Sequence, residues 1–122
     1  MRKKIITAID DSPVLLTTLQ GILAERFEFR GFSGVDRALR YLNSHVVDLI
    51  ILDIRMPMMD GHQLLAAIRE IPDLKEVPVL MLTSSTSVTD IRKAVSEGAS
   101  DYILKPVDTE ILEKKIASLI GE

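Results

Sequence analysis

The 122-residue sequence contains no cysteine, and its aromatic residues are limited to two Tyr and three Phe. Without cysteine the chain has no disulfide, no thiolate zinc site and no cysteine nucleophile. Long apolar runs are missing too, since none approaches the ~20 residues of a membrane span. The run at residues 5–9, after the basic residues 2–4, is shorter than the core of a secretory signal. We therefore expect no membrane insertion and a cytoplasmic location.

An excess of positive charge is also lacking. Fifteen Lys and Arg face eighteen Asp and Glu, a net charge of −3. This balance does not favour nucleic-acid binding through neutralisation of phosphates. The hydrophobic fraction of 47% is enough for a core at this length. We expect residues 1–122 to form a single domain.

Short apolar segments alternate five times with amphipathic ones. The predicted strands are residues 4–9, 27–32, 47–52, 77–82 and 101–104. Three of them are nearly continuous apolar runs, which is typical of parallel strands covered by helices on both faces. Five strand-then-helix units predict an α/β fold with a doubly wound parallel sheet.

The predicted helices have recognisable starts. Ser12 caps the first, with Pro13 at its first position, and Asp60-Gly61 opens the third. Ser87 and Asp90 resemble a capping box for the fourth, which Gly98 is expected to end. The second covers residues 34–44 and the fifth starts near residue 108.

Each helix is expected to bury an apolar stripe. The first would bury Val14, Leu15, Leu19, Ile22 and Leu23, and the second Ala38, Leu39 and Leu42. The third would bury Leu64, Leu65 and Ile68, and the fifth Ile111, Leu112, Ile116, Leu119 and Ile120. Glu110 and Lys114 are predicted to pair on the exposed side of the fifth helix.

Polar residues follow four of the five strands. They are Asp10 and Asp11, Asp53, Thr83 with Ser84 and Ser85, and Lys105. Because ligands of open α/β sheets bind outside the carboxyl ends of the strands, these side chains are expected to share one site. Three carboxylates repel one another unless a cation joins them, and an all-oxygen ligand set favours Mg²⁺. A lysine and a hydroxyl group bind phosphoryl oxygens, and a carboxylate can accept a phosphoryl group. The pattern indicates Mg²⁺-dependent phosphoryl chemistry.

Each of these residues also has a simpler interpretation when it is taken alone. Asp10 and Asp11 fit a turn before a capped helix, and Asp53 fits the start of a loop. Thr83 fits a strand end, and Lys105 fits a solvated surface. Taken together, these interpretations do not explain why polar residues follow four of the five strands.

The chain resembles the receiver domain of two-component response regulators over its whole length. Residues 53–61, Asp-Ile-Arg-Met-Pro-Met-Met-Asp-Gly, resemble the D-x-x-M-P-x-x-D-G segment of that family. The acidic pair, the Thr and the Lys-Pro stand in the family's order and spacing around it. The resemblance implies a flavodoxin-like (βα)₅ domain with strand order 2-1-3-4-5.

The resemblance also implies residue roles. Asp53 would be the phosphoacceptor. Asp10, Asp11 and Asp53 would hold Mg²⁺, with the backbone carbonyl of Arg55. Thr83 and Lys105 would contact phosphoryl oxygens.

Two further residues take their implied roles from the resemblance alone. Tyr102 would be the switch aromatic that turns inward as Thr83 moves, although a half-exposed strand tyrosine is the simpler interpretation. Pro106 would follow a cis peptide bond.

The implied function is a phosphorylation-activated signalling switch. A sensor histidine kinase, a phosphotransfer protein or a small phosphodonor would supply the phosphoryl group. The face formed by the fourth helix, fifth strand and fifth helix would then control an output protein or a fused effector domain. Its expected exposed residues are Arg92, Lys93, Glu97, Glu113 and Lys114. Self-phosphorylation and autodephosphorylation are the reactions expected, with no external substrate turned over.

The oligomeric state implied is a monomer or a phosphorylation-dependent dimer. Val107 stands where regulators fused to winged-helix DNA-binding domains often carry Phe, which argues against a DNA-binding output. His45 and His62 lie away from the strand ends and are assigned no chemistry.

Three other classes fit less well. An Asp-nucleophile phosphohydrolase expects a second acid two residues after the nucleophile, where this chain has Arg55. A flavin- or dinucleotide-binding domain needs a Gly- or hydroxyl-rich loop after the first strand, where this chain has two acids. A degenerate receiver that only binds partners would not need a complete site.

Overall fold

The computed structural model describes residues 3–54, 60–84 and 88–121. Five parallel strands form one sheet in the order β2-β1-β3-β4-β5. Their bounds are β1 Ile5–Ile9, β2 Glu28–Phe32, β3 Leu49–Asp53, β4 Val79–Thr83 and β5 Asp101–Leu104. The α/β class and the strand order 2-1-3-4-5 are confirmed.

A helix follows each strand. The bounds are α1 Pro13–Leu23, α2 Val35–Ser44, α3 Gly61–Glu70, α4 Val88–Ser96 and α5 Thr109–Ile120. A short 3₁₀ helix, η1 Pro72–Leu74, precedes β4 and was not predicted from the sequence. No helix in the described ranges is long and apolar enough to cross a membrane.

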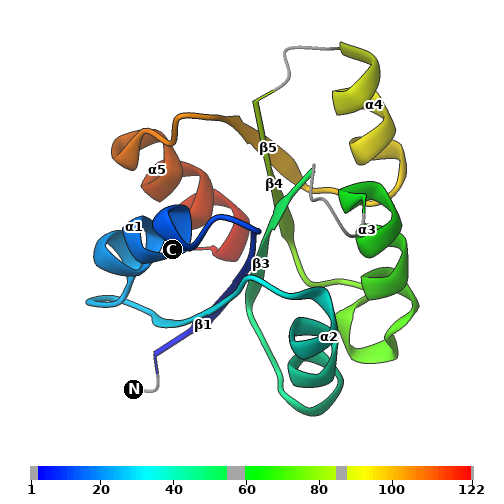
Figure 1. Ribbon diagram of the computed structural model, residues 1–122, viewed down its shortest axis with the longest axis horizontal. Coiled ribbons are helices and arrows are strands. Elements are labelled where there is room, and N and C mark those ends of the chain that lie inside the picture. The colour runs from blue at the N-terminus through cyan, green and yellow to red at the C-terminus, as the bar shows by residue number, and fades with distance from the viewer. Residues whose placement is uncertain (1–2, 55–59, 85–87, 122) are drawn as a thin grey trace.

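The sheet lies between two helical layers (Figure 1). Helices α1 and α5 cover one face, and α2, α3 and α4 cover the other. Each face has its own apolar core. Leu19 and Leu23 of α1 pack with Leu112 of α5 on the first, and Leu42 of α2 packs with Leu65 of α3 on the second. All five residues of β3 and of β4 are buried, as expected of strands covered on both sides.

Local signals at the helix starts act as the sequence predicts. Leu15 N donates to Ser12 Oγ, and Pro13 is the first residue of α1. Asp60 accepts from His62 N at the start of α3, and Asp108 accepts from Ile111 N at the start of α5. The exposed Glu110–Lys114 pair is also present, with an N–O distance of 3.1 Å.

Some expected boundaries were wrong by one or two residues. The ladder extends through Asp53 and Thr83, so both residues end their strands instead of following them. Gly34 is the N-cap of α2 and not its first residue. Gly98 ends α4 as predicted, because the last helical residue is Ser96 and Gly98 follows with φ +110°, the left-handed conformation of a glycine just past a helix end. The capping box at Ser87 falls outside the described residues.

Two expected core residues lie on the surface. Val14 is 76% exposed and Ile111 is 49% exposed, so their prediction as buried was wrong. Both lie in the first turn of a helix, at the sheet edge where the strands end. Helical periodicity gives the direction of a side chain but not whether another element covers it there.

Candidate functional site

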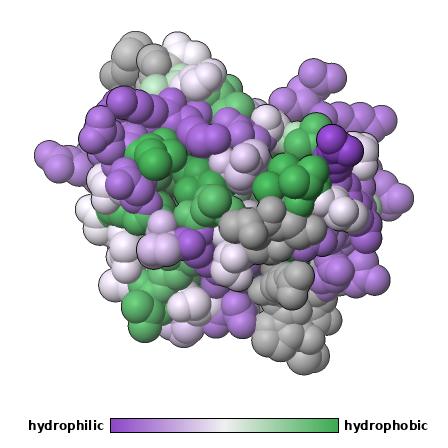
Figure 2. Space-filling model, turned by 90° about the horizontal axis from the view of Figure 1, so that it is seen from above, coloured by the Kyte–Doolittle hydropathy of each residue, from purple (hydrophilic) through white to green (hydrophobic). Residues whose placement is uncertain are grey.

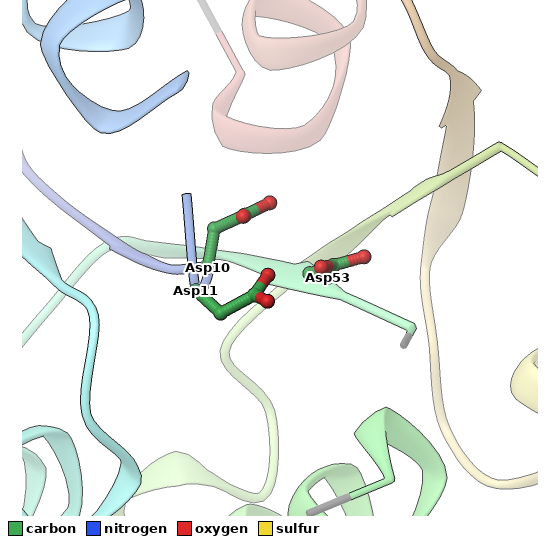
Figure 3. A group of neighbouring side chains, drawn as sticks. All are labelled: Asp10, Asp11 and Asp53. Atoms are coloured by element: carbon green, nitrogen blue, oxygen red, sulfur yellow. The ribbon is translucent and has the colours of Figure 1, made fainter. Parts of the chain in front are cut away.

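Three carboxylates meet at the carboxyl edge of the sheet. Asp10 and Asp11 directly follow β1, and Asp53 is the last residue of β3 (Figure 3). One carboxylate oxygen from each lies within 4.8 Å of the others. Asp10 is 1% exposed and Asp53 4% exposed, whereas Asp11 is open to solvent. The sequence analysis placed these three residues together, and the structure does the same.

Lys105, directly after β5, reaches two of these carboxylates. Its Nζ lies 3.1 Å from Asp10 Oδ2 and 3.3 Å from Asp53 Oδ1. Burial alone would lower the pKa of Lys105, but its hydrogen bonds and attraction to Asp10 and Asp53 outweigh burial and raise the pKa above its ordinary value. The lysine therefore stays charged and compensates part of the negative charge.

The backbone holds both sides of this cluster in place. Ser12 N donates to Asp10 Oδ1 at 2.9 Å, which orients the buried carboxylate. Ile54 N donates to Leu82 O at 3.0 Å, which continues the β3–β4 ladder just beyond Asp53. The first bond joins a main-chain donor to the Asp10 side chain and the second lies within the sheet, so the fold itself positions both carboxylates.

Helix α3 begins directly against the backbone of Asp53. Gly61 N donates to Ile54 O at 2.7 Å. A Cβ on Gly61 would lie 2.4 Å from Asp53 O and 2.6 Å from Ile54 Cα. Only glycine allows this approach, so the Asp60-Gly61 pair both starts the helix and supports the candidate acceptor.

The hydroxyl and the aromatic residue singled out in the sequence lie on the neighbouring strands. Thr83 is buried at the end of β4, and its carbonyl accepts from Lys105 N at 2.7 Å. Tyr102, in β5 opposite Met81, is half-buried. Lys115 Nζ lies 5.1 Å from the centre of the Tyr102 ring and 2.9 Å from Asp101 Oδ1. The Lys105–Pro106 peptide bond is cis.

One candidate ligand is outside the described part of the chain. The backbone carbonyl of Arg55, expected to join the metal site, falls within residues 55–59. Ser85 falls within residues 85–87, while Ser84 is exposed directly after β4.

The structure also shows a contact that the sequence analysis missed. His62 Nδ1 lies 2.7 Å from Glu97 Oε1, joining α3 to the residue after α4. The sequence carries no signal for this pair, because the two residues are separated by 35 positions and belong to different helical units.

Residues of the expected output face differ in exposure. Arg92, Lys93 and Lys114 are exposed, but Glu113 is half-buried and contacts Arg26, and Glu97 is half-buried against His62. Four of the exposed large apolar residues, Val88, Val95, Leu104 and Ile111, belong to α4, β5 and α5. Figure 2 shows that apolar side chains form separate patches among hydrophilic ones on the face seen from above Figure 1.

A doubly wound sheet with three carboxylates and a lysine at its carboxyl edge agrees with the comparisons to known proteins. The family model of the response regulator receiver domain matches residues 6–117. The two-component response regulator ORR5 of rice (Oryza sativa subsp. japonica) is 39% identical over 104 residues, covering 84% of this chain and 78% of that protein. The chain belongs to the response regulator receiver family.

Solved structures agree with this assignment. The chemotaxis protein CheY4 of Vibrio cholerae superposes with a TM-score of 0.92 and 28% identity, covering 96% of this chain and 98% of that one. The receiver domain of the sensor histidine kinase PA1611 from Pseudomonas aeruginosa has a TM-score of 0.88 and 25% identity, covering 98% and 99%. That structure has a magnesium ion coordinated in its active-site cleft.

The family assignment gives the general function. This chain is a receiver domain of two-component signal transduction, in which phosphorylation acts as the switch. Receiver domains bind Mg²⁺ in the active site, and the acidic cluster of this chain offers the all-oxygen donor set that suits this ion.

Proposed function

We propose that Asp53 is the phosphoacceptor of this receiver domain. The observation that carries the proposal is the environment of its carboxylate. Asp53 is buried at the carboxyl edge of the sheet, lies 3.3 Å from the ammonium group of Lys105, and has two further carboxylates within 4.8 Å. A carboxylate can act as the nucleophile in phosphoryl transfer. Here the negative charge of the transferred phosphoryl group would lie beside the Lys105 ammonium group.

The proposed reaction transfers a phosphoryl group to one carboxylate oxygen of Asp53. That oxygen forms a bond to phosphorus, and the bond from phosphorus to its carrier breaks. With a phosphohistidine donor the imidazole leaves and keeps the bond electrons, and with acetyl phosphate the leaving group is acetate. Hydrolysis by water restores the Asp53 carboxylate and releases inorganic phosphate, so the only compounds consumed are the phosphodonor and water.

Asp10, Asp11 and Asp53 are the side chains that would hold Mg²⁺, together with the Arg55 carbonyl. The bound ion would neutralise negative charge on the carboxylates and on the incoming phosphoryl group. Asp11, the exposed member of the cluster, lies on the side open to a partner. Asp10 is held by Ser12 N and Lys105, so its carboxylate is already oriented.

Lys105 and Thr83 would respond to the new phosphoryl group. The Lys105 ammonium group already lies beside Asp53 and can pair with a phosphoryl oxygen. Thr83, at the end of the adjacent strand, would donate its hydroxyl hydrogen to another. A shift of Thr83 would make room for Tyr102, whose ring is half-buried on β5. The face of α4, β5 and α5 would then change its shape for an output partner.

The partners proposed follow from this chemistry. A sensor histidine kinase or a phosphotransfer protein would carry the phosphoryl group to Asp53. A downstream protein or a fused effector domain would bind the face of α4, β5 and α5. The domain itself is not proposed to bind nucleic acid.

Labelling with acetyl phosphate and Mg²⁺ tests the acceptor. Asp53→Asn should abolish incorporation measured by intact-mass spectrometry, because the amide is no longer a nucleophilic carboxylate. Asp60→Asn is the matched control, since Asn caps helices as well as Asp does and this residue is only seven positions away. Labelling that persists in Asp53→Asn would refute the assignment.

A further inference from the structure

A part-buried polar pair connects α3 with the end of α4. His62 Nδ1 and Glu97 Oε1 are 2.7 Å apart, and their side chains are 7% and 27% exposed. His62 lies in the first turn of α3, and Glu97 directly follows α4. Figure 1 shows the C-terminal end of α4 beside α3. Side chains of these types are seldom buried without a partner, so each one satisfies the other.

Apolar packing holds α4 only weakly. Ala94 is its one buried residue, whereas α3 buries five: Gly61, His62, Leu64, Leu65 and Ile68. Val88 and Val95 of α4 are 60% and 54% exposed. An element with so little buried apolar surface has low local stability. Polar contacts at its end therefore contribute to its position.

In the part of the chain that the structure describes, two residues of α3 make polar contacts with the end of α4. Besides His62 with Glu97, Arg69 donates from Nη2 to Gly98 O at 2.6 Å. The Arg69 guanidinium also donates to Leu74 O and Val77 O, so it is fixed by the segment before β4. Of the two contacts, the arginine keeps its charge at all ordinary pH values and the histidine does not.

His62 is linked through the backbone to the proposed acceptor. Its N–H donates to Asp60 Oδ1 at 2.7 Å, and Gly61 before it donates to Ile54 O, next to Asp53. The same turn thus touches the Asp53 segment on one side and α4 on the other. A displacement of the Asp53 segment can therefore reach the end of α4 through this turn, and a displacement of α4 can reach the Asp53 segment.

We propose that His62 and Glu97 form a pH-dependent tie, called here the α3–α4 tie, that holds α4 in its unphosphorylated position. Imidazole is the side chain whose ordinary charge change falls between about pH 5 and pH 8. Among the described residues, the Glu97 carboxylate contacts the imidazole, Asp60 accepts from the His62 N–H, and the Arg69 guanidinium binds Gly98 O next to Glu97. With the imidazole charged, the contact is an ion pair, and with it neutral only a weaker hydrogen bond remains. Acid strengthens the tie, and alkali loosens it.

The consequence for signalling rests on the function proposed above. If phosphorylation of Asp53 requires α4 to move, a stronger tie opposes it. The domain would then accept phosphoryl groups more slowly at pH 6 than at pH 8 for a reason located in α3 and α4, outside the acidic cluster.

Nuclear magnetic resonance of the unphosphorylated protein tests the tie itself. Amide signals of residues 88–96 should shift as the pH is varied in the wild type. They should not follow this titration in His62→Gln and should follow it less in Glu97→Gln. His45→Gln is the matched control, because His45 is the other of the two histidines and is exposed on α2's end. A titration of α4 signals that survives in His62→Gln would overturn the proposal.

Labelling rates test its effect on the switch. With acetyl phosphate and Mg²⁺ at about pH 6, His62→Gln should be labelled about fivefold faster than wild type. This ratio is expected when a charge-assisted hydrogen bond is lost. At about pH 8 the two proteins should be labelled at equal rates. A ratio that does not change with pH would overturn this part. Should His62→Gln fail to fold, Glu97→Gln, changed at the more exposed partner, decides both measurements.

The two proposals fail in different ways. If Asp53 is not the acceptor, Asp53→Asn is still labelled while the α4 signals still follow His62. If the tie is absent, Asp53→Asn loses labelling, but His62→Gln changes neither the pH dependence of the α4 amide signals nor the labelling rate.

Discussion

The ammonium group of Lys105 lies 3.3 Å from Oδ1 of Asp53, although the two residues belong to the ends of different units of the fold. The same group reaches Asp10 at 3.1 Å. Lys105 therefore neutralises part of the charge of the acidic cluster before any metal or phosphoryl group arrives. Two of the predictions below depend on this relationship.

The first prediction concerns alkaline stability. Because the folded state raises the pKa of Lys105 above its ordinary 10.5, it binds this proton more tightly than the unfolded chain does. The resulting stabilisation is complete below about pH 10.5 and is lost as pH rises through the higher folded value. The difference in unfolding free energy between wild type and Lys105→Met should therefore stay constant up to about pH 10.5 and shrink as the pH rises further. Lys114→Met, at an exposed pair, is the control and should show little change.

The second prediction concerns removal of Mg²⁺. A chelator should stop labelling by acetyl phosphate but leave the circular dichroism spectrum and melting temperature of the metal-free domain intact, because Lys105 already compensates Asp10 and Asp53. Adding Mg²⁺ should raise the melting temperature, since the ion binds the folded state. In Asp11→Asn the same rise in melting temperature should need a Mg²⁺ concentration at least tenfold higher. This factor corresponds to a loss of about 1.4 kcal/mol in binding free energy.

Asp73→Asn, at an exposed acid in η1, serves as the control for Asp11→Asn. It should leave the Mg²⁺ response unchanged. Unfolding on chelation would show instead that the metal has a structural role.

The third prediction concerns Gly61. Gly61→Ala places a methyl group 2.4 Å from Asp53 O, a backbone atom that cannot move aside without shifting β3. We expect a loss of about 1–3 kcal/mol in unfolding free energy, typical of overpacking, and slower labelling of Asp53. Urea titration measures the first and mass spectrometry the second.

Gly21→Ala is the matched control for Gly61→Ala. Gly21 lies inside α1, and a Cβ there meets nothing within 4 Å. This change should stabilise the domain by about 0.5–1 kcal/mol, as Ala does in helices. Equal effects of the two substitutions would contradict the steric argument.

The fourth prediction concerns Arg69. Its guanidinium group donates to Leu74 O, Val77 O and Gly98 O, at 2.7, 2.6 and 2.6 Å. Arg69→Met removes the guanidinium donor from three part-buried carbonyls and should cost about 3 kcal/mol or more in urea denaturation. Arg69→Lys should not restore the stability, because an ammonium group cannot reproduce the planar arrangement of donors.

Arg26→Met tests whether the loss of any arginine contact would lower the unfolding free energy as much as Arg69→Met. The Arg26–Glu113 pair is 3.4 Å long and largely exposed, so its loss should cost about 0–1 kcal/mol. A cost for Arg69→Met no larger than this would show that the three carbonyls find other partners.

Much of the fold could be predicted from local patterns. Continuous apolar runs predicted β3 and β4 as buried strands, and Ser12 and Asp108 marked helix starts that the structure has. These features depend on side-chain periodicity and on hydrogen bonds between near neighbours, which a sequence shows directly. At Val14 and Ile111 burial would have required another element to cover the side chain. Periodicity therefore predicted these two residues as buried, and both are exposed.

The sequence by itself determined the fold class and the grouping of Asp10, Asp11, Asp53, Thr83 and Lys105 at one edge. In a parallel sheet all strands end on the same side, so residues at the strand ends meet whatever the details of packing. The contacts made there were decided only by the tertiary structure. It set Lys105 between Asp10 and Asp53, started α3 against Asp53 through Gly61, and brought His62 to Glu97. Such contacts join side chains far apart in the sequence, and their geometry depends on how the helices pack on the sheet.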